Sequence, residues 1–139
     1  MPLTIYCMTM NNPKKEPPSP ADLLIGIVGP CASGKSTLIE SLNHLGYHTR
    51  HIAQEHSYVQ DMWQRLTNPD LLIFLDASYP VTCKRRKLDW SEADWQEQQR
   101  RLSHAKEHAD LYLETDSLSA EEVFRKVLDF IQAGQWKNK

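Results

Sequence analysis

The sequence holds little that would specify a disulfide framework, a zinc site or a membrane anchor. Its three cysteines, Cys7, Cys31 and Cys83, are odd in number, far apart and outside any CxxC or Cys/His ligand spacing, which argues against disulfides and zinc. No stretch approaches the ~18 consecutive apolar residues of a transmembrane helix, and the N-terminus lacks the apolar core of a signal peptide. We therefore expect reduced thiols, a cytoplasmic location and no membrane partner.

The sequence also lacks a strong excess of positive or negative charge. The chain has 16 basic and 18 acidic side chains, so no global positive field favours nucleic acid as a partner. Hydrophobic residues make up 40% of the chain and charged ones 24%, which is typical of a globular domain. A length of 139 residues is short for two independent cores, so we expect one domain.

Residues 11–20 read NNPKKEPPSP and hold half of the eight prolines. Such a segment loses more conformational entropy on ordering than it recovers by burial. We therefore expect residues 1–20 to form a flexible, proline-rich leader and residues 21–139 to form the folded domain.

From position 22 onward, short apolar runs alternate with longer segments of helical period, which is typical of an α/β domain on a parallel sheet. The expected strands are 23–28, 47–53, 71–75 and 110–114. Helices are expected at 35–45, 58–66 and 78–87, with further helices opening at the capping-box patterns of Ser91 with Asp94 and Ser119 with Glu122. The last of these is expected to end at Gly134.

The most specific motif lies between the first expected strand and the first expected helix. Residues 29–36 read GPCASGKS and satisfy the phosphate-binding pattern GxxxxGK[ST] in the context that the pattern requires. Gly29 and Gly34 let backbone N–H groups converge on phosphate oxygens, and the helix start adds free N–H groups and a positive dipole end. We predict binding of a nucleoside triphosphate, ATP with Mg²⁺.

Individual roles follow from the chemistry of the ligand. Lys35 is expected to bridge the β- and γ-phosphates, Ser36 to place its hydroxyl on Mg²⁺, and Thr37 to assist at the α-phosphate. The predicted nucleotide-binding residues of the motif are Gly29, Pro30, Cys31, Ala32, Ser33, Gly34, Lys35, Ser36 and Thr37.

This loop resembles that of the P-loop nucleoside and nucleotide kinases, small parallel α/β phosphotransferases in which ATP gives its γ-phosphoryl group to a bound acceptor. Residues 71–78, LLIFLDAS, are similar to the late strand of cytidylate-kinase-like members, and residues 109–119, ADLYLETDSLS, to their final strand and turn. The resemblance covers residues 22–134. It implies a three-layer P-loop NTPase fold with four to five parallel strands flanked by helices, and phosphotransfer to a small-molecule acceptor such as a nucleoside or nucleotide.

The same resemblance suggests which arginines meet the phosphates. In these kinases an arginine-bearing helix follows the late strand, here with Arg85 and Arg86, and a mobile lid follows, here with Arg100 and Arg101. Preplaced guanidinium groups stabilise the charge that spreads over the transferred group, and a closed lid excludes water. A run of basic residues on a helix is more often a solvated face, which is the competing interpretation.

Three residues are candidates for the acidic partner of Mg²⁺. Asp76 ends an apolar strand and fits the Walker B pattern, but it fits a turn or cap residue equally well. In the second case the acid is Glu55 or Asp61, after the second expected strand, at the edge where such sheets bind ligands. Glu55, beside His56, is also a candidate general base or a group that orients the acceptor hydroxyl.

One departure from the kinase pattern supports a second hypothesis. These kinases usually have five core strands and a longer stretch between the loop helix and the late strand than residues 36–75 provide here. The alternative to a kinase is therefore an ATP-binding regulatory or scaffold module without phosphotransfer.

Overall fold

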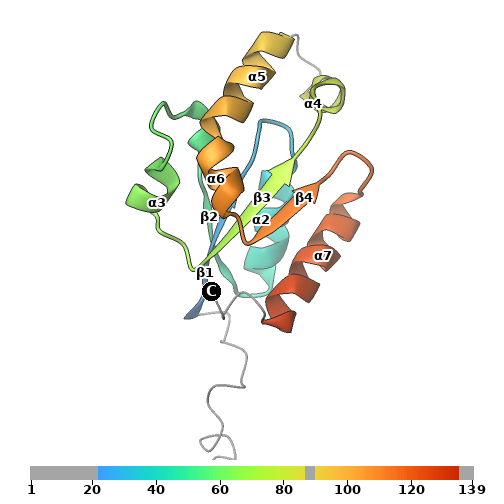
Figure 1. Cartoon of the computed structure of the whole chain (residues 1–139). Coiled ribbons are helices and arrows are strands. Elements are labelled where there is room, and N and C mark those ends of the chain that lie inside the picture. The colour runs from blue at the N-terminus through green and yellow to red at the C-terminus, as the bar shows by residue number, and fades with distance from the viewer. Residues whose placement is uncertain (1–21, 87–89, 135–139) are drawn as a thin grey trace, which may run out of the picture.

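The computed structural model describes residues 22–86 and 90–134, so the expected leader lies outside the described residues. Within the described residues, four strands form one sheet in the order β2-β1-β3-β4 (Figure 1). All neighbouring pairs are parallel. The strands are β1 (Leu24–Val28), β2 (His48–His51), β3 (Leu71–Asp76) and β4 (Leu111–Glu114). The predicted α/β class with a small parallel sheet flanked by helices is confirmed.

The two central strands have the apolar runs that burial on both faces requires. Every residue of β3 is buried, as are the last four of β1. Their register pairs Ile25 with Leu71 and Ile27 with Ile73. The edge strand β2 is largely exposed and reads HTRH, so it is held by backbone pairing with β1 rather than by burial of its own side chains. It is also shorter than the expected 47–53.

The helices are α2 (Lys35–His44), α3 (Met62–Leu66), α4 (Tyr79–Arg86), α5 (Glu92–Arg101), α6 (Ser103–His108) and α7 (Ala120–Ala133), with a 3₁₀ turn η3 (Gln54–His56). Both predicted capping boxes form, at the starts of α5 and α7. Gly134 closes α7 with a φ of 71°. The expected helix 58–66 is reduced to the five residues of α3, and the end of the expected helix 78–87 lies outside the described residues.

Helices cover both faces of the sheet. On one face α2 and α7 pack Leu42, Val127 and Ile131 against alternate residues of β1 and β3. On the other face Trp63 of α3 and Leu102 and Ala105 at α6 pack against the remaining residues of these strands. Figure 1 shows α5 and α6 on the opposite side of the sheet from α2. The arrangement therefore has three layers.

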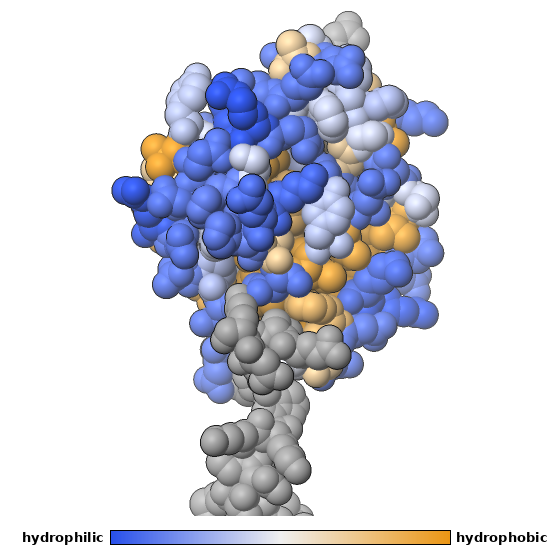
Figure 2. Space-filling model, viewed as in Figure 1, coloured by the Kyte–Doolittle hydropathy of each residue, from blue (hydrophilic) through white to orange (hydrophobic). Residues whose placement is uncertain are grey.

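The outer surface differs between the two sides. Figure 2 shows apolar residues gathered over the β4 and α7 side, whereas the α5 and α6 side is mainly hydrophilic. Tyr112 of β4 is 40% exposed, and Leu118 in the following turn is partly buried. None of the described helices has the length and apolar character to cross a membrane.

Candidate functional site

Residues 29–37 connect the carboxyl end of β1 to the first turn of α2, and two glycines shape this connection. A Cβ at Gly29 would lie 2.0 Å from the backbone oxygen of Leu75, so no side chain fits where the loop passes β3. Gly34 has a φ of 101° and directly precedes α2, which is a left-handed conformation that other residues rarely adopt. The backbone path therefore excludes a side chain at Gly29 and disfavours one at Gly34.

Between the glycines the loop is strained and incompletely hydrogen-bonded. Ala32 has a positive φ of 65°, which costs roughly 1–2 kcal/mol for a residue with a Cβ. The Ser33 side chain is buried, and its Oγ has no hydrogen-bond partner among the described residues. Strain and unsatisfied polar atoms of this kind concentrate at binding sites.

The start of α2 is open to an anion. Within the described part of the chain no side chain caps this helix, and its first turn holds no acidic residue. The first N–H groups of a helix lack intrahelical partners and carry the positive end of the dipole. Ser36 and Thr37, in this first turn, are exposed. These groups are free to receive phosphate oxygens and a hydrated cation.

Lys35 is folded back over the loop that it terminates. Its side chain is 6% exposed and forms an ion pair with Glu55, with 3.1 Å between Nζ and Oε2. The ammonium also donates to the carbonyl oxygens of Gly29 at 2.6 Å and Pro30 at 2.9 Å. The three contacts satisfy the three donors of the ammonium group, which explains how a charged lysine is tolerated in a buried position.

Glu55 comes from η3, the turn that follows β2, and it is almost completely buried. Its second oxygen, Oε1, has no hydrogen-bond partner among residues 22–86 and 90–134. Gln54 anchors the turn, because its side chain accepts from the backbone N–H of Trp63 and donates to the carbonyl of Val59. A carboxylate with one free oxygen is thereby held opposite Lys35.

The other two candidate acids have different surroundings. Asp61 pairs with Arg65 on the surface, and the hydrogen bond from this guanidinium holds the pKa of Asp61 below its ordinary value. Asp76 accepts hydrogen bonds from the backbone N–H of Ala77, the Gln99 side chain and the Tyr112 hydroxyl. The Asp76 carboxylate thus ties β3 to α5 and β4, on the face of the sheet opposite α2. Of the three acids, Glu55 is the one that contacts Lys35.

The hydrogen bond between Tyr112 and Asp76 also affects the phenol. Burial, followed by the hydrogen bond to Asp76 and its negative charge, raises the pKa of Tyr112 well above its ordinary value. The oxygen–oxygen distance is 2.6 Å. The neutral phenol is therefore the form that the folded protein favours.

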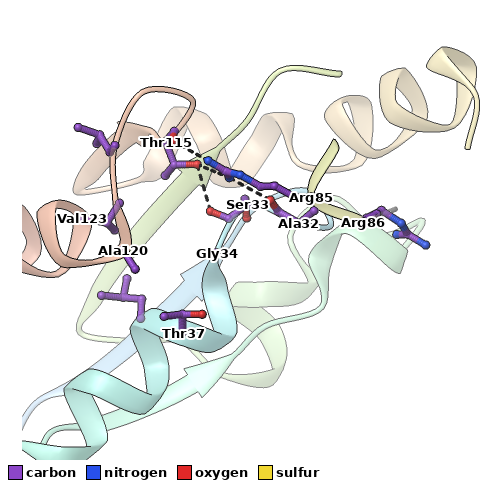
Figure 3. Close-up of a pocket in the computed structure, with 11 residues that line it drawn as sticks. Ala32, Ser33, Gly34, Thr37, Arg85, Arg86, Thr115, Ala120 and Val123 are labelled. Carbon is purple, nitrogen blue, oxygen red and sulfur yellow. Dashed lines mark hydrogen bonds between the residues drawn. The ribbon is translucent and has the colours of Figure 1, made fainter. Parts of the chain in front are cut away.

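Two of the four candidate arginines, Arg85 and Arg101, donate hydrogen bonds to the loop or to Glu55, whereas Arg86 and Arg100 have partners elsewhere. Arg85 donates to the carbonyl of Ala32 and to both oxygens of Thr115, so it extends across the loop (Figure 3). Arg101 donates to the carbonyl of Glu55 and lies over the Tyr58 ring. Arg86 instead lies over the Trp90 ring. Arg100 is 70% exposed and is paired with Glu97.

A cavity of about 540 Å³ lies between the loop, α4 and the turn after β4. Its polar end is formed by the loop with Arg85 and Thr115 (Figure 3). Its apolar wall is formed by Leu38, Leu118 and Val123. Thr115 is buried and contacts the Ser33 carbonyl at 3.1 Å. Sequence reasoning did not identify Thr115 as a site residue, because a single threonine in a turn has no pattern that marks it.

A second residue outside the sequence predictions is Gln98 of α5. Its side-chain oxygen accepts from the backbone N–H of Cys31 at 3.0 Å, and its nitrogen donates to the Cys31 sulfur at 3.2 Å. Helix α5 therefore rests on the loop and occupies one of the loop's N–H groups. These partners are 67 residues apart in the chain, so no local pattern could reveal the contact.

Cys31, Glu55 and His56 also meet beside Lys35. Their potential ligand atoms all lie within 4.8 Å of one another, although the cysteine spacing in the sequence argues against such a cluster. Neither the protein-family models nor the curated proteins compared with this chain give a match.

Proposed function

We propose that the loop 29–37 binds the phosphates of ATP with Mg²⁺, in a P-loop NTPase fold related to the small-molecule kinases. The observation that carries the proposal is the junction of β1 and α2. The two motif glycines occupy backbone positions that exclude or disfavour a side chain there, and the uncapped start of α2 directs its free N–H groups to the same place. Few functions other than anion binding explain this combination with GxxxxGK[ST].

The cavity next to the loop supports a nucleoside in addition to the phosphates. Its volume of about 540 Å³ falls within the range of small-molecule sites, which run from roughly 300 to 1,000 Å³. An apolar wall is suited to a base, and Arg85, at the polar end of the cavity, donates to the Ala32 carbonyl of the loop. In this arrangement Leu118 and Val123 contact the base while Ser33, Gly34 and Thr37 face the phosphates.

Lys35 and Glu55 supply the chemistry in this proposal. When a triphosphate enters, Lys35 exchanges the carboxylate for the β- and γ-phosphates, and Glu55 is left free beside the reacting group. The hydroxyl oxygen of the acceptor attacks the γ-phosphorus, and the hydroxyl proton passes to Glu55. The bond between the γ-phosphorus and the oxygen that bridges the β- and γ-phosphates breaks, and ADP leaves. Ser36 is the expected protein ligand of Mg²⁺, with Asp76 or Glu55 as its acidic partner.

A binding module without phosphotransfer is the second candidate, and two contacts favour it. The Asp76 carboxylate is engaged by Gln99 and Tyr112 rather than directed to Ser36. A protein with these features can bind nucleotide as a signal without turning it over.

Calorimetry with ATP, in the presence and absence of Mg²⁺, tests the site. Lys35→Ala should weaken ATP binding at least about tenfold under both conditions, since a charge-assisted contact contributes about 1.5–3 kcal/mol. Ser36→Ala should weaken binding only when Mg²⁺ is present. Lys126→Ala, at an exposed lysine of α7, is the matched control. Unchanged ATP binding in Lys35→Ala would refute the assignment.

Turnover separates the two candidates. Purified protein with ATP and Mg²⁺ is assayed against a panel of nucleosides, nucleotides and other small hydroxyl compounds for ADP release. ADP release that depends on both an acceptor and Glu55 supports the kinase. ATP binding without acceptor-dependent release, in a wild type that binds ATP normally, supports the binding module.

A further inference from the structure

We propose that Cys31, Glu55 and His56 form a binding site for Zn²⁺ on the outer side of the loop 29–37. The three residues come from two segments, the loop after β1 and the turn η3 after β2. These segments lie together because β1 and β2 are neighbouring parallel strands whose carboxyl ends share one edge of the sheet. The inference does not depend on nucleotide binding or on phosphotransfer.

The spacing of the three side chains fits one tetrahedral ion. The Cys31 sulfur lies 3.8 Å from Nε2 of His56, and a Glu55 carboxylate oxygen lies within 4.8 Å of both. The Glu55 oxygen that pairs with Lys35, Oε2, lies 3.8 Å from the same nitrogen. Ligands at the usual zinc bond lengths, about 2.3 Å to sulfur and about 2.0–2.2 Å to nitrogen or oxygen, stand about 3.4–3.6 Å apart around a tetrahedron. The cysteine–histidine separation exceeds this spacing by a few tenths of an ångström, and since all three ligand atoms lie within 4.8 Å of one another, side-chain shifts of about 1 Å would close the site.

The donor set selects the class of metal. A thiolate and an imidazole favour Zn²⁺ over Mg²⁺ or Ca²⁺, which prefer oxygen ligands. Three protein ligands leave a fourth position for water or for an oxygen of a bound molecule. The cysteine loses its proton when the metal binds, so zinc uptake releases a proton to solution.

The side chains of Gln98 and Glu55 have contacts that support a zinc site here. The buried side chain of Gln98 donates to the Cys31 sulfur at 3.2 Å, and a hydrogen bond of this kind orients a metal-binding sulfur. Glu55, which is 2% exposed, keeps Oε1 without a hydrogen-bond partner among the described residues. Its carboxylate therefore has an oxygen available for a second cation while Oε2 faces Lys35.

Cobalt titration of the full chain, kept reduced and free of nucleotide, tests the proposal. Co²⁺ replaces Zn²⁺ in tetrahedral sites and reports a bound thiolate by an intense sulfur-to-cobalt charge-transfer band. We expect this band at one equivalent of Co²⁺ and its loss when Zn²⁺ is added. A variant that lacks the other two cysteines, Cys7→Ser with Cys83→Ser, should keep the band, and Cys31→Ser should lose it.

Histidine variants give an independent test that folding defects do not confuse. His56 is 60% exposed, so His56→Gln should fold normally, as circular dichroism can verify, and should weaken Co²⁺ binding at least about tenfold. His51→Gln, at an exposed histidine of β2, is the matched control and should bind like the wild type. The proposal is overturned if no band forms in the wild type, if the band persists in Cys31→Ser, or if His56→Gln binds as well as His51→Gln.

Discussion

Removing the charge of Glu55 while keeping its shape is the sharpest perturbation of the site. Glu55→Gln leaves the ammonium of Lys35 in a buried position without its counter-ion. At 3.1 Å the two charges attract by roughly 5 kcal/mol at an effective dielectric constant of about 20. Breaking a buried pair costs roughly 3–5 kcal/mol, because one charge stays buried and uncompensated.

The structure narrows the loss of folding free energy expected for Glu55→Gln. Lys35 keeps its hydrogen bonds to the carbonyl oxygens of Gly29 and Pro30 in the variant, so the loss should fall near the lower limit, at about 3 kcal/mol. With a denaturant slope near 2 kcal/mol/M, typical of a small domain, the urea midpoint should fall by about 1.5 M. Glu121→Gln, which removes an exposed partner of Arg125, is the control and should leave the midpoint nearly unchanged.

A double-mutant cycle isolates the pair itself. Lys35→Met combined with Glu55→Gln removes both charges, so the double variant should be considerably more stable than the sum of the two single losses predicts. The coupling should approach 3 kcal/mol, roughly the loss expected for Glu55→Gln alone. If Glu55→Gln destabilises the protein by less than about 1 kcal/mol, or if the two losses simply add, Lys35 and Glu55 are not a buried ion pair.

Three further results are expected. Gly29→Ala should prevent normal folding, because its Cβ would lie 2.0 Å from the backbone oxygen of Leu75. Gly34→Ala has open space around it and should lower the free energy of unfolding by only about 1–3 kcal/mol through backbone strain. Thermal unfolding of the two variants tests this difference. Ser119→Ala should lower the free energy of unfolding by about 1 kcal/mol by removing the N-cap of α7, measured with urea. Because folding raises the pKa of Tyr112 above its ordinary value of 10.0, the neutral phenol contributes to the stability of the fold below that pH. This contribution is lost as the pH rises above it, since the tyrosine of the unfolded chain then loses its proton first. Tyr112→Phe should therefore show a shallower loss of stability in alkali than the wild type, and parallel alkaline profiles would contradict this explanation.

Local patterns in the sequence were sufficient for much of the fold. The apolar runs of β1 and β3 are buried on both faces, and the capping boxes at Ser91 and Ser119 open α5 and α7. These features depend on residues within a few positions of one another, so the sequence expresses them directly. The motif from Gly29 to Ser36 belongs to the same category, since its strand, loop and helix are contiguous.

The edge of the sheet was harder to predict. The exposed strand β2 has no hydrophobic alternation, because its stability comes from backbone pairing with β1. The helix expected at 58–66 is limited to α3 because Gln54 ties the preceding segment into a turn through Val59 and Trp63. Both outcomes depend on partners that a local window does not contain.

By itself, the sequence determined the α/β class, the central strands and a loop whose glycines and lysine are suited to phosphate. Only the tertiary structure decided which distant side chains meet that loop: Glu55 on Lys35, Gln98 on Cys31, and Arg85 with Thr115. The physical reason is that parallel strands bring their carboxyl ends to one edge of the sheet, where segments far apart in the chain become neighbours. Their contacts are set by strand order and helix packing, which no short stretch of sequence encodes.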